Sequence, residues 1–493
     1  MSLKINILAN YASQLYITLI GIILVPLYVK YMGAEAYGLV GFFAMLQSWF
    51  NILDLGLSPT IARESARYRG GAMSIVEYLR LFRALSVIFF LVALLGGGLL
   101  WSFSGVIASH WLKVETLPIG EVVLAIEIMA ISVALRWMGG LFRGVITGSE
   151  RMVWLSSFNT LIATIRFIGV MASMWIFGFT PRIFFIHQIF VAIFEISGLF
   201  FMSRLLLPKV NKTELPIGWS FRTVQPLIKF SLTIAFTSSV WILVTQTDKL
   251  ILSGILPLAE YGYFTLAVMV ASGILVISGP VSSAIMPRMA RLHTEGKNQE
   301  LIYIYRNSTR LVSALAGSAS ITLAFCAEEI LSVWSGDQHL AKSAAPILTL
   351  YAIGNGFSAA CAFPYYLQYA KGNLRYHLFG NIFFAAIIIP CIAFSASNFG
   401  SIGAGYTWMI LNILLLLAWV GFIHYKIEPG IHRSWLIKDV ISIHIPTIFA
   451  ILLLRNFLDL KKYNNTSLIA ATIIASLILA FTTKRVIENY GKV

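Results

Sequence analysis

The sequence predicts an all-α protein that crosses a lipid bilayer about 14 times, as two parallel six-helix repeats followed by two further helices. Of its 493 residues, 58% are hydrophobic and only 12% are charged, whereas soluble domains carry about 25% charged residues. Many uncharged segments exceed the roughly 20 residues that a helix needs to cross a membrane. A duplicated stretch of sequence predicts the division into two repeats.

The duplicated stretch lies at 32–71 and again at 258–297. In both copies a short turn precedes an apolar span, which is followed by a basic amphipathic segment. The equivalent positions that keep one residue type are Tyr37 and Tyr261, Gly38 and Gly262, Met45 and Met269, Ser48 and Ser272, Ser58 and Ser282, Ile61 and Ile285, Ala66 and Ala290, and Arg67 and Arg291. Parallel repeats of this kind are typical of transporters, with the substrate site between the halves. A duplicated scaffold without transport activity is the alternative.

We expect spans at 7–29, 36–57, 84–103, 121–142, 153–176, 183–203, 230–252, 261–286, 311–334, 343–369, 377–396, 401–423, 440–456 and 464–482. The run 376–425 contains no charged side chain and is predicted to be two helices, separated by the turn at 395–405. Residues 1–203 would form an N-terminal lobe of six helices and 230–424 a C-terminal lobe. Residues 204–229 would link them in the cytoplasm, and 425–493 would supply the additional helix pair.

The distribution of charge predicts the orientation in the membrane. If the N-terminus is cytoplasmic, most of the 36 lysines and arginines fall in inner segments, above all in 58–83, 204–229 and 287–310. Cytoplasmic loops carry this excess of positive charge in membrane proteins. We therefore expect both termini in the cytoplasm and no signal peptide. The net charge of +15 then reflects topology and anionic lipid headgroups, so we expect no nucleic-acid partner.

Polar side chains inside the predicted spans recur at spacings that place them on one helix face. Arg166 lies roughly 20 Å from the inner surface at about 1.5 Å per residue, too deep to reach the interface, whereas Arg143 is expected at that interface. The stripes are Gln47, Asn51 and Asp54; Arg136 and Arg143; Asn159 and Arg166; Gln188 and Glu195; and Trp241 with Asp248.

Two interpretations of these stripes remain open. In the first, the charges pair for structural reasons, Asp54 with Arg63, Glu195 with Arg166 and Asp248 with Lys249, because buried charges are usually paired. In the second, the stripes line a water-accessible path for a solute. An unpaired arginine on such a path suits a phosphate or a carboxylate, since its planar guanidinium donates two parallel hydrogen bonds.

Motifs for catalysis, cofactors and metals are absent from the sequence. There is no phosphate-binding loop of the ATPase type, no H-E-x-x-H pattern and no cysteine–histidine cluster. The three cysteines, Cys326, Cys361 and Cys391, lie inside apolar spans, which argues against a disulfide framework. We therefore expect a protein that is not an enzyme and that has no cofactor and no metal.

The opening NYASQLYITLIGIILVPLYVKYMGAEAYGLVGFF, followed by LDLGLSPTIARESAR, resembles the N-terminus of Wzx-type O-antigen repeat-unit flippases of the MOP superfamily. The second-half stretch TDKLILSGILPLAEYGYFTLA, at 247–267, resembles the seventh-to-eighth helix signature of that family. The length and the duplicated lobes agree, so the resemblance covers essentially the whole chain. It implies a bacterial inner-membrane protein that transfers undecaprenyl-pyrophosphate-linked oligosaccharides from the cytoplasmic to the periplasmic leaflet, beside other polysaccharide-assembly membrane proteins.

A mechanistic hypothesis, built on the polar stripes and consistent with the resemblance, assigns roles to individual residues. The predicted ion-coupling residues, for a proton or Na⁺, are Asp248, Glu127, Glu195 and Asp54. The predicted substrate-binding residues are Arg166 and Arg136 for pyrophosphate, Arg63, Arg67 and Arg291 for steering it inward, and Asn159, Gln47, Asn51 and Trp241 for the glycan.

Three rival functions remain open. A multidrug or cation antiporter of the same superfamily should have a net acidic site, whereas the deepest charge here is Arg166. A membrane polysaccharide polymerase would need longer outer loops than this chain offers. A peptidoglycan-precursor flippase of the superfamily is a closer relative than these two. The residues do not distinguish it from an O-antigen repeat-unit flippase.

Overall fold

The computed structural model describes residues 3–208, 224–457 and 465–490. Within these ranges the structure is helical and contains no β-strand. Its internal contacts divide the chain into two compact units, Met1–Gly262 and Tyr263–Val493. The division assigns α10 and the start of α11 to the first unit. The predicted linker at 204–229 lies mostly outside the described residues, so the lobe boundaries stay a prediction.

The first unit is built from long helices joined by short turns. Its helices are α1 (Leu3–Met32), α2 (Ala34–Phe50), α3 (Leu57–Arg69), α4 (Ile75–Ser102), α5 (Ser104–Val106), α6 (Ile119–Gly148), α7 (Met152–Thr164), α8 (Val170–Phe177), α9 (Pro181–Leu206) and α10 (Gln225–Ile255). Local chemistry fixes several starts. Ser74 caps α4 by accepting from the Glu77 amide, and Thr180 caps α9 just before Pro181, as small hydroxyl residues do at helix N-termini.

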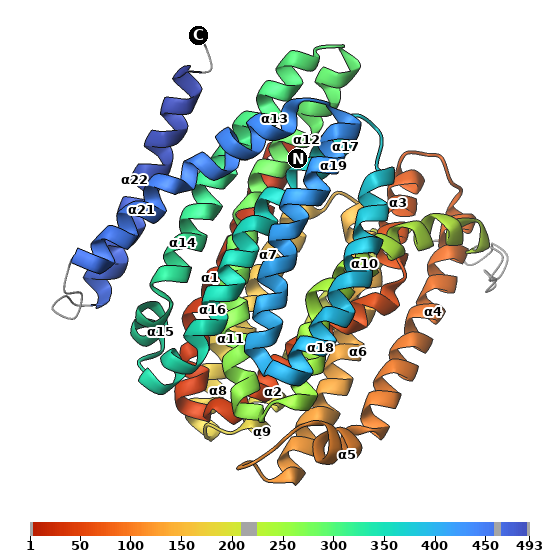
Figure 1. The fold of residues 1–493 in the computed structure, drawn as a ribbon. Coiled ribbons are helices and arrows are strands. Elements are labelled where there is room, and N and C mark those ends of the chain that lie inside the picture. Colours follow the sequence, from red (N-terminus) through yellow and green to blue (C-terminus); the bar gives the residue numbers. More distant parts are fainter. Residues whose placement is uncertain (1–2, 209–223, 458–464, 491–493) are drawn as a thin grey trace. The chain divides into compact units, whose positions relative to one another are not determined.

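Helix α6 is the centre of the first unit, because α3, α4 and α9 all pack against it (Figure 1). Glycines allow the close approach to α3. A Cβ on Gly144 would lie 2.3 Å from the Ile61 side chain, and one on Gly148 would lie 2.1 Å from the Ala62 carbonyl oxygen. The apolar core beside this contact includes Phe89 and Trp137, whose rings stack at 4.7 Å. These contacts hold the polar face of α6 in place.

We expect the substitution Gly148→Ala to destabilise the first unit by about 1–3 kcal/mol, the usual cost of overpacking a tight contact. The added methyl group would collide with backbone, which cannot rotate away. Thermal unfolding of the purified protein in detergent measures the effect. Gly120→Ala, on the same helix but with nothing within 4 Å of the new Cβ, is the matched control. Equal midpoints for the two variants would contradict the packing described.

The second unit continues from α11 (Leu258–Val276), which begins in the first unit. Its other helices are α12 (Ser278–Thr294), α13 (Asn298–Val312), α14 (Ser318–Phe325), α15 (Ala327–Ser335), α16 (Gln338–Cys361), α17 (Phe363–Ala370), α18 (Arg375–Leu414), α19 (Val420–Ile427), α20 (Ile431–Ser434), α21 (Ser442–Phe457) and α22 (Asn465–Tyr490). Helix α16 packs on α14 and α18, and Asp337 caps its start through the amides of His339 and Leu340.

The predicted helices are present, but the count of 14 membrane spans is not confirmed. By length and composition, ten described helices can cross a membrane, or up to 11 if the bent pair Asn298–Phe325 and Ala327–Ser335 forms one span. Two predicted spans, on α6 and α10, are helices outside that set, and two others fall within Arg375–Ile427. The two predicted spans within Arg375–Ile427 are separated at Gly400, which has φ 61° and ψ −146°. Gly400 lies inside the predicted turn at 395–405.

The duplicated stretch folds alike in both copies. In the first copy α2 is followed by a break at Asn51–Asp54 and then by α3, and in the second α11 is followed by α12. The equivalent glycines Gly38 and Gly262 lie together within the first unit. A Cβ on Gly38 would lie 2.1 Å from the Leu258 carbonyl oxygen, and one on Gly262 would lie 2.7 Å from that of Ala34. The pattern that predicted the repeat therefore marks a close helix contact.

Candidate functional site

The candidate site is a cluster of polar side chains inside the first unit. Three stretches of helix each contribute two residues seven positions apart, which lie on one face. Helix α6 supplies Arg136 and Arg143, the segment from α7 into the next turn supplies Asn159 and Arg166, and α9 supplies Gln188 and Glu195. Gln47 of α2 completes the set of residues, hereafter the arginine cluster.

Glu195 is the centre of the arginine cluster, and its side chain is 8% exposed. Its Oε1 accepts a hydrogen bond from Arg143 Nη2. Its Oε2 accepts from Arg166 Nη2 at 2.8 Å and lies 3.8 Å from Arg136 Nε. Three guanidinium groups therefore share one carboxylate. The predicted pair of Glu195 with Arg166 is confirmed, as part of this larger set.

The other contacts of the cluster are with neutral amides. Arg136 donates to Gln47 Oε1 at 3.0 Å and to Gln188 Oε1 at 2.8 Å, and Arg143 donates to Asn159 Oδ1 at 2.6 Å. The Arg136 guanidinium also lies 5.2 Å from the centre of the Phe43 ring, within cation–π range. Amide oxygens orient the arginines without cancelling their charge. With Glu195 ionised, three positive charges and one negative charge leave a net charge of +2.

The cluster also contains hydrogen-bond donors that have no acceptor in the described part of the chain. Among the described residues, Arg136 Nε and Arg166 Nε are buried and have no hydrogen-bond acceptor. The Arg136 side chain is only 9% exposed, whereas 27% of Arg166 and 32% of Arg143 remain accessible. A buried donor without an acceptor costs about 1–3 kcal/mol. Excess positive charge, unused donors and partial access together are the chemistry of an anion-binding site.

Arg166 lies on an irregular part of its helix. Residues Ile165–Gly169 form a π-helical turn between α7 and α8, and such turns are frequent at functional sites. Side chains from neighbouring helices bind its carbonyls. His187 Nε2 donates to the Ile165 oxygen at 2.9 Å, with Ser173 on its other nitrogen at 2.8 Å, and Tyr28 donates to the Phe167 oxygen at 2.8 Å. These contacts position Arg166.

We expect His187→Ala to weaken anion binding by the cluster, because it removes the donor that satisfies the Ile165 carbonyl. A fully buried acceptor without a partner costs about 1–3 kcal/mol, so this half-buried carbonyl should cost less, and relaxation of the turn would move Arg166. Titration with inorganic pyrophosphate and the unfolding midpoint should both show the change. His110→Ala, which removes an exposed histidine hydrogen-bonded to Ser109, is the control and should change neither. An unaltered affinity in His187→Ala would show that the turn does not position Arg166.

The arginine cluster contains five of the predicted site residues: Arg166, Arg136, Asn159, Gln47 and Glu195. The predicted steering arginines lie elsewhere. Arg67 of α3 pairs with Glu64 at 2.8 Å, and Arg63 lies 4.0 Å from the same carboxylate. In the second unit Arg291 pairs with Glu295 at 3.4 Å, and a hydrogen bond from Lys297 lowers the pKa of the exposed Glu295 carboxyl. Their steering role stays a prediction.

The other predicted residues of the first unit are also outside the cluster. Asn51 is exposed in the break after α2, Trp241 is exposed on α10, and Glu127 is half-buried on α6. The predicted pair of Asp54 with Arg63 is wrong. Asp54 instead accepts from the Ser58 hydroxyl at 2.6 Å and from its amide at 3.2 Å, in the first turn of α3.

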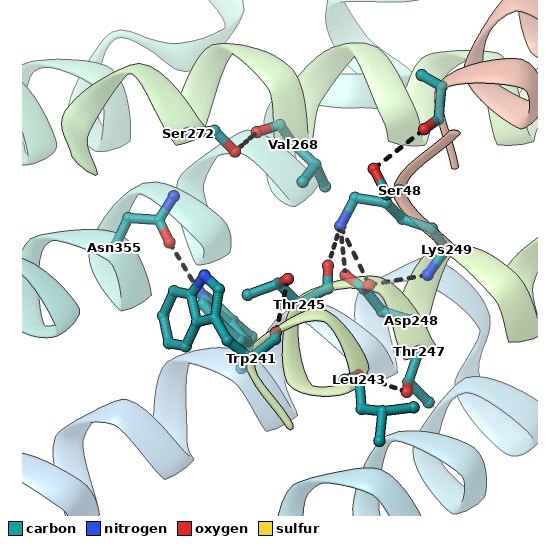
Figure 2. A network of polar contacts seen from close by, with 12 residues as sticks. Ser48, Trp241, Leu243, Thr245, Thr247, Asp248, Lys249, Val268, Ser272 and Asn355 are labelled. Atoms are coloured by element: carbon teal, nitrogen blue, oxygen red, sulfur yellow. Dashed lines mark hydrogen bonds and ion pairs between the residues drawn. The ribbon is translucent and has the colours of Figure 1, made fainter. Parts of the chain in front are cut away.

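Asp248 lies on α10 beside Lys249, and Figure 2 shows this pair from close by. The Lys249 ammonium lies 3.2 Å from Asp248 Oδ1 and donates to the Thr245 carbonyl at 2.6 Å. The predicted pair is therefore confirmed. A role of Asp248 in ion coupling stays a prediction.

Sequence reasoning missed two features of the structure. Arg143, expected at the interface, belongs to the cluster; its spacing from Arg136 was the available signal. In the second unit, Asp439 is 0% exposed and binds two arginines of α13, at 2.6 Å from Arg306 Nε and 2.6 Å from Arg310 Nε. No spacing rule could connect α13 with a residue so far along the chain.

Among the described residues, no group of three or more histidine, cysteine or acidic side chains could hold a metal ion.

Comparison with known proteins agrees with these observations. The sequence model of a family described as "Polysaccharide biosynthesis protein" matches residues 3–293. A protein of Shigella flexneri, named as a candidate O-antigen transporter, is 21% identical over 429 residues, which are 85% of this chain and 98% of that protein. The resemblance drawn from the opening of the sequence is confirmed.

Two solved structures show the same fold. The lipid II flippase MurJ in an inward closed conformation has a TM-score of 0.72 at 14% identity, with 98% of each chain covered. An inward-facing multidrug resistance transporter of the MATE family, from the MOP superfamily, has a TM-score of 0.64 at 12% identity, over 85% of this chain and 96% of the other. This likeness shows that the chain shares the fold of these two membrane proteins.

Proposed function

Because the chain belongs to the polysaccharide biosynthesis protein family, we propose that it is a flippase for lipid-linked oligosaccharides. Its substrate would be an undecaprenyl-pyrophosphate-linked O-antigen or polysaccharide repeat unit, carried from the cytoplasmic to the periplasmic leaflet. The protein would work in a bacterial inner membrane with both termini in the cytoplasm, a topology supported by the basic inner loops. Other membrane proteins of polysaccharide assembly would be its partners.

The arginine cluster carries this proposal. Its net positive charge and its two unmatched buried donors suit a diphosphate, which accepts several charge-assisted hydrogen bonds at once. Arg166 and Arg136 would hold the diphosphate, with Arg143 as a third cation. Gln47 and Asn159 would orient the arginines through their side-chain oxygens. Their side-chain amide nitrogens would donate hydrogen bonds to the first sugar. The prenyl tail would stay in the lipid.

Transport would follow the alternating access of parallel-repeat transporters, in which the halves move against one another around the site. Arg63, Arg67 and Arg291 would attract the diphosphate to the cytoplasmic surface. Asn51 and Trp241 would contact the glycan farther along its path. A coupling proton or Na⁺ would bind Asp248, Glu127, Glu195 or Asp54, and each charge moving with the membrane potential supplies about 2.3 kcal/mol per 100 mV.

A MATE-type exporter of cationic drugs shares the fold and is the main alternative. A cationic drug would have to bind beside three arginines that share a single carboxylate. Electrostatic repulsion between the drug and the arginines disfavours such binding. The test is deletion of the gene in its host, followed by measurement of surface polysaccharide, of the leaflet that holds the lipid-linked repeat units, and of drug sensitivity. We expect loss of surface glycan with repeat units confined to the cytoplasmic leaflet. New drug sensitivity with normal glycan would favour the exporter.

A further inference from the structure

We infer that Glu195 is an internal competitor of the substrate. In the structure its carboxylate lies between the three arginines of the cluster, and the substrate phosphate would displace it from there. The displaced carboxylate takes up one proton from water and becomes neutral. This inference rests on the proposed function, and it assigns the regulation of the same site to one residue.

The contacts of Glu195 show that it already fills the role of a bound anion. Both of its oxygens are used, Oε1 by Arg143 and Oε2 by Arg166, with Arg136 Nε 3.8 Å away. A pair kept only for structure needs one arginine for one carboxylate. Here one helix, α6, and a π-helical turn direct three arginines to the same point, so the carboxylate lies where a phosphate would receive the most donors.

One carboxylate does not satisfy this site. Arg136 Nε and Arg166 Nε are buried without an acceptor, and Arg136 is nine-tenths buried. The remaining partners, Gln47, Gln188 and Asn159, are neutral. His187, next to Gln188 on α9, is engaged with Ser173 and the Ile165 carbonyl. The charged groups that face Glu195 are therefore the three arginines, from α6 and from the turn after α7.

A phosphate bound to these arginines would lie close to the Glu195 carboxylate. Two neighbouring anions repel strongly where the effective dielectric constant is low, as it is inside a protein. Displacement and protonation of Glu195 remove this repulsion and leave three positive charges for the diphosphate. When the substrate leaves, Glu195 loses its proton and returns to the arginines. Competition of this kind keeps binding reversible, so the diphosphate is not trapped by an excess of positive charge.

The test uses the purified full-length protein in detergent and inorganic pyrophosphate as the probe. Titration calorimetry in two buffers of different ionisation enthalpy gives both the affinity and the number of protons taken up. Protonation of pyrophosphate itself is common to all variants, so the difference between variants reports Glu195. The variants are wild type, Glu195→Gln, and Glu115→Gln as a control at an exposed glutamate outside the cluster.

We expect Glu195→Gln to bind pyrophosphate about tenfold more tightly than wild type, because one competing charge is removed. It should also take up fewer protons, by up to about one per site, since a carboxylate displaced by an anion is the group that protonates. Glu115→Gln should match wild type in both. Equal affinity and equal proton uptake in Glu195→Gln and wild type would overturn the role of Glu195 and leave the proposed function intact. Binding that is absent from wild type, or that survives Arg166→Ala unchanged, would overturn both.

Glu195→Gln could unfold, because it leaves three arginines without a counter-charge. The double substitution Glu195→Gln with Arg143→Gln restores the net charge of the cluster to that of wild type. It should fold and should bind pyrophosphate without the additional proton. Proton uptake equal to that of wild type in this double variant would also overturn the inference.

Discussion

Arg166→Ala is expected to reduce pyrophosphate binding by about 10- to 100-fold and to lower export of surface glycan almost to the level of a deletion strain. The substitution removes one of three positive charges and the buried Nε donor that has no acceptor in the described protein. A hydrogen bond to a charged group contributes about 1.5–3 kcal/mol, which corresponds to this range of affinity. Calorimetry on the purified variant measures binding, and complementation of the deletion strain measures export.

The variant should fold, because Glu195 keeps its contacts with Arg143 and Arg136. Arg182→Ala is the matched control: it removes an exposed arginine at the start of α9, on the helix that carries Glu195. It should bind and export like wild type. Full export by Arg166→Ala, at a protein level equal to that of the control, would remove Arg166 from the site.

Asp439→Ala is expected to destabilise the second unit by about 3–5 kcal/mol, the usual cost of removing one partner of a buried ion pair. Asp439 is fully buried in the turn Trp435–Ile441 and forms ion pairs with both Arg306 and Arg310 of α13. Without it, two largely buried guanidinium groups would lie side by side. The midpoint temperature of thermal unfolding of the purified protein and the yield of the protein in membranes should both fall.

Glu295→Gln is the comparison for Asp439→Ala. It also removes a carboxylate that pairs with two cations, Arg291 and Lys297. This site is exposed, where ion pairs are screened by water and contribute little, so no measurable change is expected. Similar losses of stability in both variants would show that burial of Asp439 is not what makes its ion pairs important.

The sequence alone predicted the fold class and the residues that share each helix face. The apolar composition and the duplicated stretch at 32–71 and 258–297 required only local patterns, and both agree with the helices observed. The seven-residue spacings of Arg136 with Arg143 and of Gln188 with Glu195 are also local, so each stripe could be read without a structure. Five predicted site residues therefore lie together in the arginine cluster.

The convergence of the three stripes on Glu195 could not be predicted, because it depends on how α6, α7 and α9 pack. The sequence predicts Arg143 at the interface because the predicted span ends at 142, whereas α6 continues to Gly148. The sequence pairs Asp54 with Arg63 only because buried charges are usually paired. The chain instead turns at Leu55 and Gly56, both with positive φ, and the Asp54 carboxylate binds Ser58 in the first turn of α3. The π-helical turn depends on donors from α1 and α9, which no local pattern reveals.

The most direct test of the proposed function is translocation by the purified protein in proteoliposomes. A fluorescent oligosaccharide linked to a polyprenyl pyrophosphate is placed in both leaflets, and its accessibility to an external quencher is followed with time. We expect wild type to move it across the bilayer and Arg166→Ala to leave it in its original leaflet. Equal rates for wild type, Arg166→Ala and protein-free vesicles would contradict both the flippase and the site.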